Sequence, residues 1–233
     1  MYILFPFFIL LSGVVAEYSG LDLALVSPFY SFPLHTWPLK AHWLTSQLLH
    51  KDGRLLVDLM ALLIFIVFVL SFFVERFKSY RKGAGYLLVA SLLGPALVAI
   101  GKDATHIYSP WDLQLFNGTQ PYIRLFDHVP EGARVGHAFP AGHSSSGFAL
   151  FSLFFLAKEY KPHLQIHALL VTLLIGFSFG LAQQMRGAHF LSHDLFSLAI
   201  CWISALFMYL VFFRNQAFLS WVSTSPKEQR ARQ

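Results

Sequence analysis

The sequence predicts an all-α integral membrane protein, a six-helix bundle whose polar, candidate active-site loops meet at the extracytoplasmic face. Hydrophobic residues make up 56% of its 233 residues and charged residues only 12%, and the mean hydropathy is +0.56. Soluble domains carry about 25% charged residues, so this chain lacks the polar surface of a water-soluble protein. Its apolar residues also gather in runs that approach the length of about 20 residues that a helix needs to cross a bilayer.

The apolar runs predict a single transmembrane domain over residues 1–222. The six candidate spans are residues 2–16, 55–74, 84–101, 143–157, 164–182 and 190–213. The first run is short, but it has no positively charged start and its first charge is Glu17. We therefore expect a retained span and not a signal peptide. Residues 223–233 are polar and are expected to form a cytoplasmic tail.

The positions of lysine and arginine predict the orientation of the bundle. Basic residues gather in the loops after the second and fourth spans and in the tail, and they include Arg76, Lys78, Arg81, Lys82, Lys158, Lys161, Arg214, Lys227, Arg230 and Arg232. Such residues mark the cytoplasmic side, so we expect both termini to be cytoplasmic. The formal charge of +5 is then a signal of topology. A nucleic-acid partner is not expected, because the charges are divided among membrane-flanking loops.

Three polar clusters fall on the opposite, extracytoplasmic side, while residues 17–54 are expected to rest on the membrane interface. The clusters are Lys102 with Pro110, then residues 139–143, then residues 186–194. Imidazoles titrate near neutral pH and can act as nucleophile and acid, and lysine and arginine bind phosphate oxygens. The backbone N–H groups of a helix start can add to that binding. The clusters therefore predict a site that handles phosphate.

These clusters resemble the motifs of the type 2 phosphatidic acid phosphatase superfamily, in a divergent bacterial-type membrane branch. The family pattern is Lys-x6-Arg-Pro, then Pro-Ser-Gly-His, then Ser-Arg-x5-His-x3-Asp, and the resemblance covers residues 102–196 and the six-span layout. It implies a phosphatase-like domain in a bacterial inner membrane, with no metal and no cofactor. The implied catalytic residues are His143 as general acid, His189 as nucleophile and Asp194 as support for the attacking imidazole. The implied phosphate-binding residues are Lys102, Arg186, Ala141 and Gly142, with Arg134 and His193 as accessory residues.

The chain departs from the family pattern at four positions. Ser109 stands where the family has the first arginine, and Gln183 where it has the second. Ala141 replaces the serine of the Gly-His motif, and His193 stands at the position of the aspartate. Arg186 is the nearest substitute for a missing arginine, since on one continuous helix Arg186, His189 and His193 would share a face. The choice between His189 and His193 as nucleophile stays open at this stage.

The leading hypothesis is a membrane phosphatase that hydrolyses a lipid phosphate or pyrophosphate monoester through a phosphohistidine, with membrane lipids as its surroundings. A close variant is a lipid phosphotransferase that uses the same histidine. The four-residue spacing of His189 and His193 also suits a metal-dependent enzyme. Polar residues in membranes further mark ion paths, so an inactive lipid-binding or transport scaffold is the last alternative. Independently of these hypotheses, Lys102 and Arg186 can each be interpreted as residues that only anchor span ends. The identity of the lipid and the oligomeric state stay open.

Overall fold

The structure is a computed structural model that describes residues 2–215, and in that part of the chain every regular element is helical. The all-α prediction is therefore confirmed for these residues. The α-helices are α1 (Leu4–Tyr18), α2 (Leu21–Val26), α3 (Gly53–Phe73), α4 (Arg81–Asp103), α5 (Gly142–Phe148), α6 (Phe151–Tyr160), α7 (Gln165–Met185) and α8 (Leu191–Phe213). The short or irregular helices are η1 (Ser27–Phe29), the π-helix η2 (Trp43–Asp52), η3 (Glu75–Tyr80), η4 (Pro110–Asp112), η5 (Gln114–Phe116) and η6 (Pro162–Leu164).

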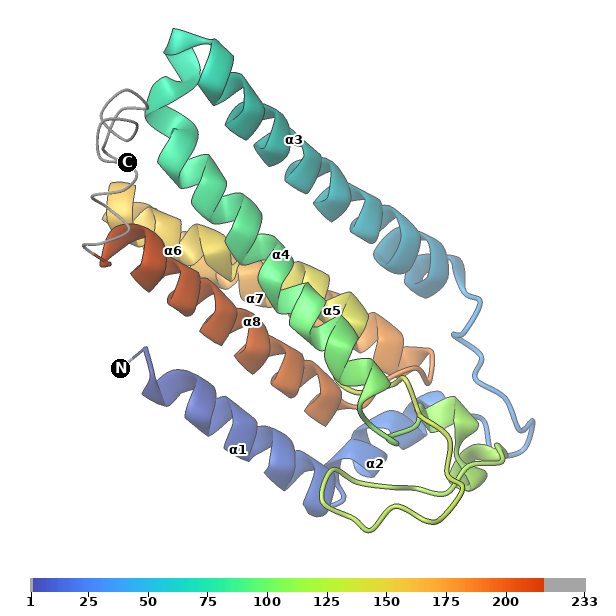
Figure 1. The fold of residues 1–233 in the computed structure, drawn as a ribbon. Coiled ribbons are helices and arrows are strands. Elements are labelled where there is room, and N and C mark those ends of the chain that lie inside the picture. Colours follow the sequence, from blue (N-terminus) through green and yellow to red (C-terminus); the bar gives the residue numbers. More distant parts are fainter. Residues whose placement is uncertain (1, 216–233) are drawn as a thin grey trace.

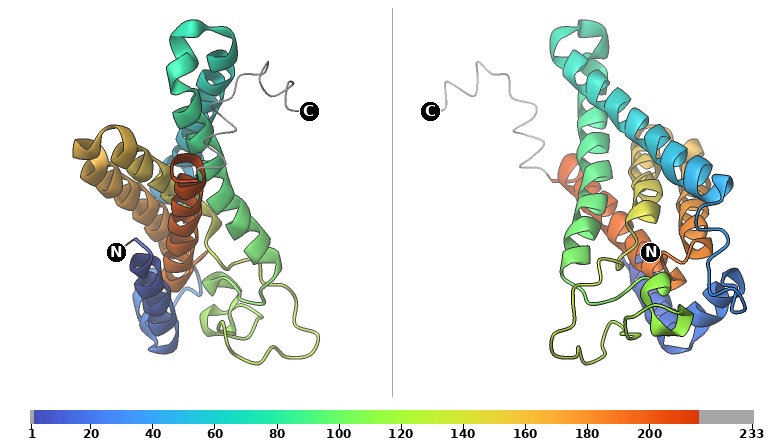
Figure 2. Two further views of the ribbon diagram at one scale, coloured as in Figure 1. Left: turned by 60° about the vertical axis from the view of Figure 1, so that its left-hand side comes forward. Right: turned by 90° about the vertical axis from the view of Figure 1, so that its right-hand side faces the viewer.

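The long helices lie side by side in a bundle, and the segment around α2 and the loop between α4 and α5 gather at one end of it (Figures 1 and 2). We call this the loop end. It is the end at which α4 finishes and at which α5 and α8 begin. The predicted tail, residues 223–233, lies outside the described residues.

Four helical segments are long and apolar enough to cross a membrane, and they make the chain an integral membrane protein. They are Trp43–Phe73, Glu75–Asp103, Pro162–Met185 and Leu191–Phe213, and they correspond to four of the six predicted spans. Leu4–Tyr18 and Leu21–Phe29 form a pair bent by 76°, which counts as a fifth span only if the two are taken together. The described residues thus give four or five spans by this measure, and the count of six stays a prediction.

The fourth predicted span, residues 143–157, is divided between α5 and α6, and neither helix is long enough to cross a bilayer alone. A serine run opens this segment, and each hydroxyl donates to the carbonyl three residues earlier: Ser144 to Ala141, Ser145 to Gly142 and Ser146 to His143. Serine hydroxyls that bond nearby carbonyls compete with regular helix geometry. The hydrophobic pattern alone does not reveal this interruption.

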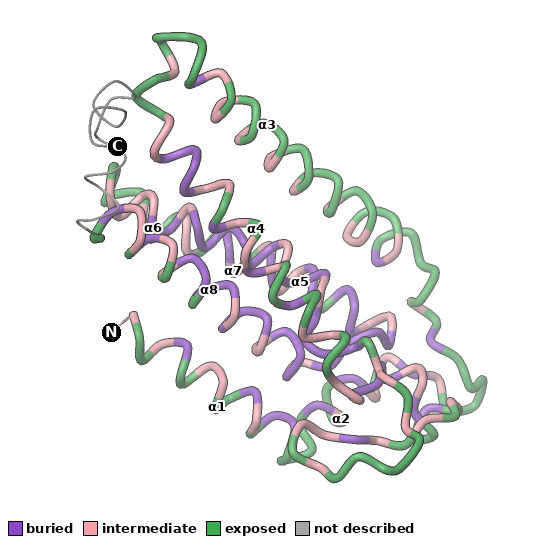
Figure 3. Tube along the Cα trace, in the orientation of Figure 1, coloured by how far each residue is buried: buried purple, intermediate pink, exposed green. Residues whose placement is uncertain are grey.

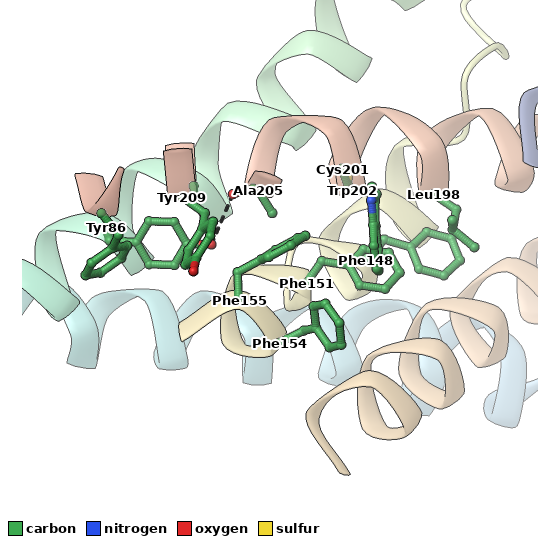
Figure 4. Close-up of a cluster of buried hydrophobic side chains, with 12 residues drawn as sticks. Tyr86, Phe148, Phe151, Phe154, Phe155, Leu198, Cys201, Trp202, Ala205 and Tyr209 are labelled. Atoms are coloured by element: carbon green, nitrogen blue, oxygen red, sulfur yellow. Dashed lines mark hydrogen bonds between the residues drawn. The ribbon is translucent and has the colours of Figure 1, made fainter. Parts of the chain in front are cut away.

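An aromatic core holds α4, α5, α6 and α8 together (Figure 4). Trp202 on α8 packs edge-on against Phe151 and Phe155, with ring centroids 5.1 Å and 5.2 Å away. The Tyr86 hydroxyl donates to the Ala205 carbonyl at 3.1 Å, which satisfies a polar group inside the bundle. The Tyr86 contact joins the first turns of α4 to the second half of α8, away from Lys102 at the end of α4 and from His193 at the start of α8.

Helix α3 is the most exposed long helix (Figure 3). Only 6% of its most apolar window is buried inside the protein, as expected for a helix that faces lipid on most sides. Its start is better anchored, because Gly53 lies against α7. A Cβ atom on Gly53 would come within 2.6 Å of the Phe179 ring. The first turns of α3 therefore lie close to the loop-end residues of α7.

Most of the segment 17–54, which was predicted to rest on the membrane interface, is exposed, but a few of its side chains are buried under the loops. Tyr30 and Trp37 pack against Phe116 in a second hydrophobic cluster. The Trp37 ring also covers Gly187, where φ is +77° and a Cβ would lie 2.5 Å from the indole. The turn between α7 and α8 is thus held in place from outside the bundle.

Candidate active site

One cavity of about 430 Å³ lies at the loop end, between α3, α4, α5 and the end of α7. Four predicted site residues line its polar end, namely Lys102, Gly142, His143 and His189, together with His50, Arg54 and Gln183. Further along, its wall becomes mostly apolar and includes Val57, Ile64, Leu92, Pro95 and Leu153. The structure therefore brings one residue or more of each polar cluster to the same cavity.

Lys102 comes from the last turn of α4 and lies over the first residue of α5. A Cβ on Gly142 would come within 3.1 Å of both Cε and Nζ of Lys102. This contact is tighter than ordinary van der Waals packing, so the lack of a side chain at Gly142 makes room for the ammonium group. Lys102 is thus a cation held inside the cavity and not a lysine that only extends to the membrane surface.

His143 is held on three sides. Its Nε2 lies 2.9 Å from the carbonyl oxygen of Leu49, and its ring stacks on Phe179 with centroids 4.7 Å apart. The ring of His50 lies 4.5 Å away. Since a carbonyl only accepts, Nε2 of His143 carries the proton of this bond. The other nitrogen, Nδ1, remains to exchange a proton with a ligand.

His189 and His193 form a pair, and only His189 lines the cavity. The Nδ1 atoms of the two rings lie 3.4 Å apart, and both residues are buried. If the His189 Nδ1–H donates to His193, the His189 Nε2 carries a free lone pair. His193 stands at the sequence position of the family aspartate, and it is the hydrogen-bond partner of His189.

Asp194 faces α7 and not the histidine pair. Its Oδ2 accepts a hydrogen bond of 2.7 Å from the Gln184 side chain. The carboxylate also lies so close to Gly180 that a Cβ there would come within 2.5 Å of Oδ2. The structure thus places Asp194 in a contact between α7 and α8, while His193 takes the contact with His189.

The remaining predicted residues lie outside the cavity lining. Arg186 donates from Nη1 to Gln183 Oε1 at 3.2 Å and from Nε to the Lys40 carbonyl at 3.1 Å. Arg134 is exposed on the loop between α4 and α5. Ala141 is fully buried, and its backbone N–H donates to the His193 carbonyl at 3.2 Å.

Sequence reasoning missed His50, Arg54 and Gln183 as parts of this site. His50 and Arg54 precede the second apolar run by a few residues and are four positions apart. That spacing places two side chains on one helix face. It is the sequence feature from which a shared position of His50 and Arg54 could have been predicted. The residues were assigned to an interfacial segment, whereas the structure continues the helix back to Trp43 through η2.

Burial lowers the pKa of His189 well below its usual range, and the neighbouring His193 and Lys102 act in the same direction. A histidine with an ordinary pKa of about 6.5 is already mostly neutral at pH 7. His189 is therefore neutral under ordinary conditions and has a lone pair to offer. This protonation state suits a nucleophile better than a cation that binds anions.

A family model of the PAP2 superfamily matches residues 83–217, which is more than half of the chain. The chain belongs to the PAP2 superfamily. Membership of PAP2, the type 2 phosphatidic acid phosphatase superfamily, implies phosphatase-type activity on phosphate esters. Neither a curated protein nor a solved structure matches the chain.

The PAP2 match includes Lys102, His143 and His189 but leaves out η2 and α3, which carry His50 and Arg54. Within residues 2–215, no group of three or more His, Cys, Asp or Glu side chains lies close enough to hold a metal ion. The metal-dependent alternative therefore has no candidate site in the described part of the chain.

Proposed function

We propose that the protein is an integral membrane phosphatase that hydrolyses a lipid phosphate or pyrophosphate monoester through a phosphohistidine intermediate. The observation that carries the proposal is the single cavity in which Lys102, His143 and His189 meet. Covalent phosphate transfer needs a nucleophile, a proton donor for the leaving oxygen, and positive charge near the phosphoryl oxygens. His189 is the nucleophile, His143 is the proton donor, and Lys102 is the positive charge.

In the first step, the Nε2 lone pair of His189 attacks phosphorus and the bond from phosphorus to the lipid oxygen breaks. His143 acts here as an imidazolium that keeps its Nε2–H on the Leu49 carbonyl. It gives its Nδ1 proton to that leaving oxygen and becomes neutral, so the lipid alcohol or lipid monophosphate departs with this oxygen protonated. Lys102 holds the phosphoryl oxygens. In the second step, water attacks phosphorus, the bond to His189 breaks, and His143 takes a proton from the water.

We assign the support of the attacking imidazole to His193, and not to Asp194. The His189 Nδ1–H, donated to His193 Nδ1, keeps Nε2 unprotonated and aimed away from the pair. Asp194 contributes indirectly, since its bond to Gln184 ties the start of α8 to the end of α7. Arg186, Arg134 and Ala141 stay outside the chemical steps.

The apolar part of the cavity supports a lipid substrate. A phosphate headgroup at the polar end would leave its chain among Val57, Ile64 and Leu153, which continue into the membrane-spanning part of the bundle. The volume of about 430 Å³ falls within the usual range of ligand pockets, about 300–1,000 Å³. Exposed α3 borders this space, so a lipid chain has a route to the bilayer at its side.

The orientation proposed is a site that faces the periplasm or exterior, in a bacterial inner membrane. Arg76 and Lys78 belong to η3, between α3 and α4, and Lys161 lies between α6 and η6. Both connections are at the end of the bundle opposite the loop end (Figure 1). Basic residues favour the cytoplasmic side, which leaves the cavity on the other side.

The test is phosphate release by the purified protein in detergent from isoprenoid pyrophosphate, phosphatidate, phosphatidylglycerophosphate and lipid A phosphate, with and without chelator. We expect release that persists in chelator and is lost in His143→Ala and His189→Ala. Release only without chelator would overturn the metal-independent mechanism. Transfer of labelled phosphate to an added lipid alcohol, without release, would indicate the phosphotransferase.

The pH dependence of kcat/KM is a separate prediction. Protonation of His189 removes the nucleophile, and burial lowers its pKa, so protonation requires a lower pH than usual. We expect the acid limb of kcat/KM to lie below about pH 6.5, the ordinary pKa of histidine. The His193→Asp variant should move this limb to higher pH, because a carboxylate stabilises the imidazolium. An acid limb in the wild type above about pH 6.5 would contradict the prediction.

A further inference from the structure

The PAP2 motifs leave this cavity short of positive charge. Of the two arginines in the family pattern, one is replaced by Ser109, which is buried away from the cavity, and the other by Gln183, which lines it but is neutral. Lys102 is then the one lysine or arginine that the family motifs bring to the cavity within the described residues. A phosphate monoester dianion held by one ammonium group is poorly compensated in a low-dielectric site.

The second cation of the cavity comes from outside the family motifs. Arg54, on the first turn of α3, lines the same cavity. Its only ion pair among the described residues joins Nε to Asp58 Oδ2 at 3.7 Å, with both side chains more than 60% exposed. Such an exposed i,i+4 pair is weak. The two Nη groups therefore remain available as a fork, the geometry that binds phosphate oxygens in pairs.

A fixed hydrogen-bond chain orients His50. Arg186 only donates, so the atom of Gln183 that it contacts at 3.2 Å is the amide oxygen. The Gln183 Nε2 group therefore faces His50 and donates to its Nδ1 at 2.9 Å. Because Nδ1 of His50 accepts, the neutral ring carries its proton on Nε2. Gln183, at the position of a family arginine, thus sets the tautomer of a neighbouring donor.

The segment that carries both residues is fastened to the site. The Leu49 carbonyl accepts the hydrogen bond from His143 Nε2 at 2.9 Å. Gly53 packs against Phe179, which in turn stacks on the His143 ring. Leu49 and Gly53, which precede His50 and Arg54, are therefore held by His143, which lines the cavity, and by the phenylalanine that stacks on it.

We propose that His50 and Arg54 bind the phosphoryl oxygens of the substrate in place of the two family arginines, and that Gln183 positions His50 for this role. The inference rests on the proposed function and deepens it. Arg54 supplies the forked cation and His50 Nε2–H supplies a neutral donor. Both act on the phosphate that His189 attacks, so the phosphate site is built from α3 as well as from the family motifs.

The experiment measures kcat and KM on the best lipid of the panel and the inhibition constant of orthovanadate, for Arg54→Gln, Arg54→Lys and His50→Ala. A lost hydrogen bond to a charged group corresponds to a change of about 10- to 100-fold. We expect kcat/KM to fall and the vanadate constant to rise by that factor in Arg54→Gln and His50→Ala. Arg54→Lys should lie between them and the wild type, because it keeps the charge and loses the fork.

Lys51→Gln is the matched control, since Lys51 is an exposed cation between the two residues and does not line the cavity. It should behave as the wild type. Wild-type kinetics and vanadate inhibition in both Arg54→Gln and His50→Ala would overturn the proposal. Absence of phosphate release by the wild type itself would instead overturn the proposed function.

Rescue separates phosphate binding from a structural role. The double variant His50→Ala with Gln183→Arg returns the family arginine to a position that lines the cavity. We expect it to recover at least about tenfold in kcat/KM over His50→Ala, since an arginine fork replaces the lost donor. If the double variant is as inactive as His50→Ala while its thermal unfolding matches the wild type, the assignment of His50 to phosphate binding is wrong.

Discussion

Replacing His189 with alanine is expected to lower the turnover number for phosphate release by at least about 10⁴-fold, because it removes the imidazole that forms the covalent intermediate in the proposed mechanism. His189 lines the cavity, is buried, and is neutral since burial lowers its pKa. Its removal leaves Lys102 and His143 in place, so substrate still binds. The measurement is single-turnover phosphate release, together with the trapping of an acid-labile phosphohistidine that the variant should lose.

His193 gives the decisive comparison for the identity of the nucleophile. It touches His189 through Nδ1 but does not line the cavity. His193→Ala should therefore lose only about 10²-fold in turnover, in line with the loss of a group that orients another, and should still form the phosphohistidine. His167→Ala on α7 is the control, because that histidine is exposed and lies away from the cavity. Retention of the phosphohistidine in His189→Ala and its loss in His193→Ala would exchange the two roles.

The cavity residues that the sequence revealed share one property. Lys102, His143 and His189 stand at the ends of long apolar runs. A charged or titratable group near the membrane is energetically costly, so its presence there indicates a function. Alternation of spans brings such ends to one face of the bundle, so their convergence follows from hydropathy and order along the chain. The ordered motifs then identified the same family that the comparison of residues 83–217 shows.

The positions of the Arg186 and Asp194 side chains could not be predicted from the sequence, because they depend on where the helix between α7 and α8 breaks. The spacing argument assumed one continuous helix from Arg186 to His193. In the structure α7 ends at Met185, Gly187 adopts φ +77°, and α8 begins at Leu191. The break turns Arg186 toward the Lys40 carbonyl and Gln183, and Asp194 toward Gln184.

The contribution of α3 was hidden for another reason. His50 and Arg54 belong to no motif of the family, and they precede the apolar run that marks the second span. Only the continuation of the helix through η2, and the contact between Gly53 and Phe179, bring these residues to the cavity. Contacts of this kind, between segments far apart in the chain, produce no hydrophobic periodicity by which a single sequence could reveal them.

Replacing Lys102 with methionine is the second large effect that we expect, a fall in kcat/KM of about 10²- to 10³-fold. Methionine keeps much of the length and volume of the side chain and removes its charge. The phosphoryl group gathers negative charge in the transition state, and Lys102 is the motif cation that lines the cavity. The effect should therefore fall on kcat as well as on KM. The measurement is the full dependence of rate on lipid concentration.

The contact between Lys102 and Gly142 supplies a graded test of the same idea. In Gly142→Ala the new Cβ would lie 3.1 Å from Lys102 Nζ, so the ammonium must move by a few tenths of an ångström while its charge remains. Displacement of a charged group from the transition state costs less than its removal, and we expect a loss of about tenfold. Gly147→Ala, whose Cβ would meet Gly176 and not the cavity, should lower stability without this selective loss in the activity of the folded protein. A Gly142→Ala variant with wild-type kcat, or a Lys102→Met variant changed only in KM, would mean that Lys102 binds the ground state and the transition state equally well and does not accelerate the chemical step.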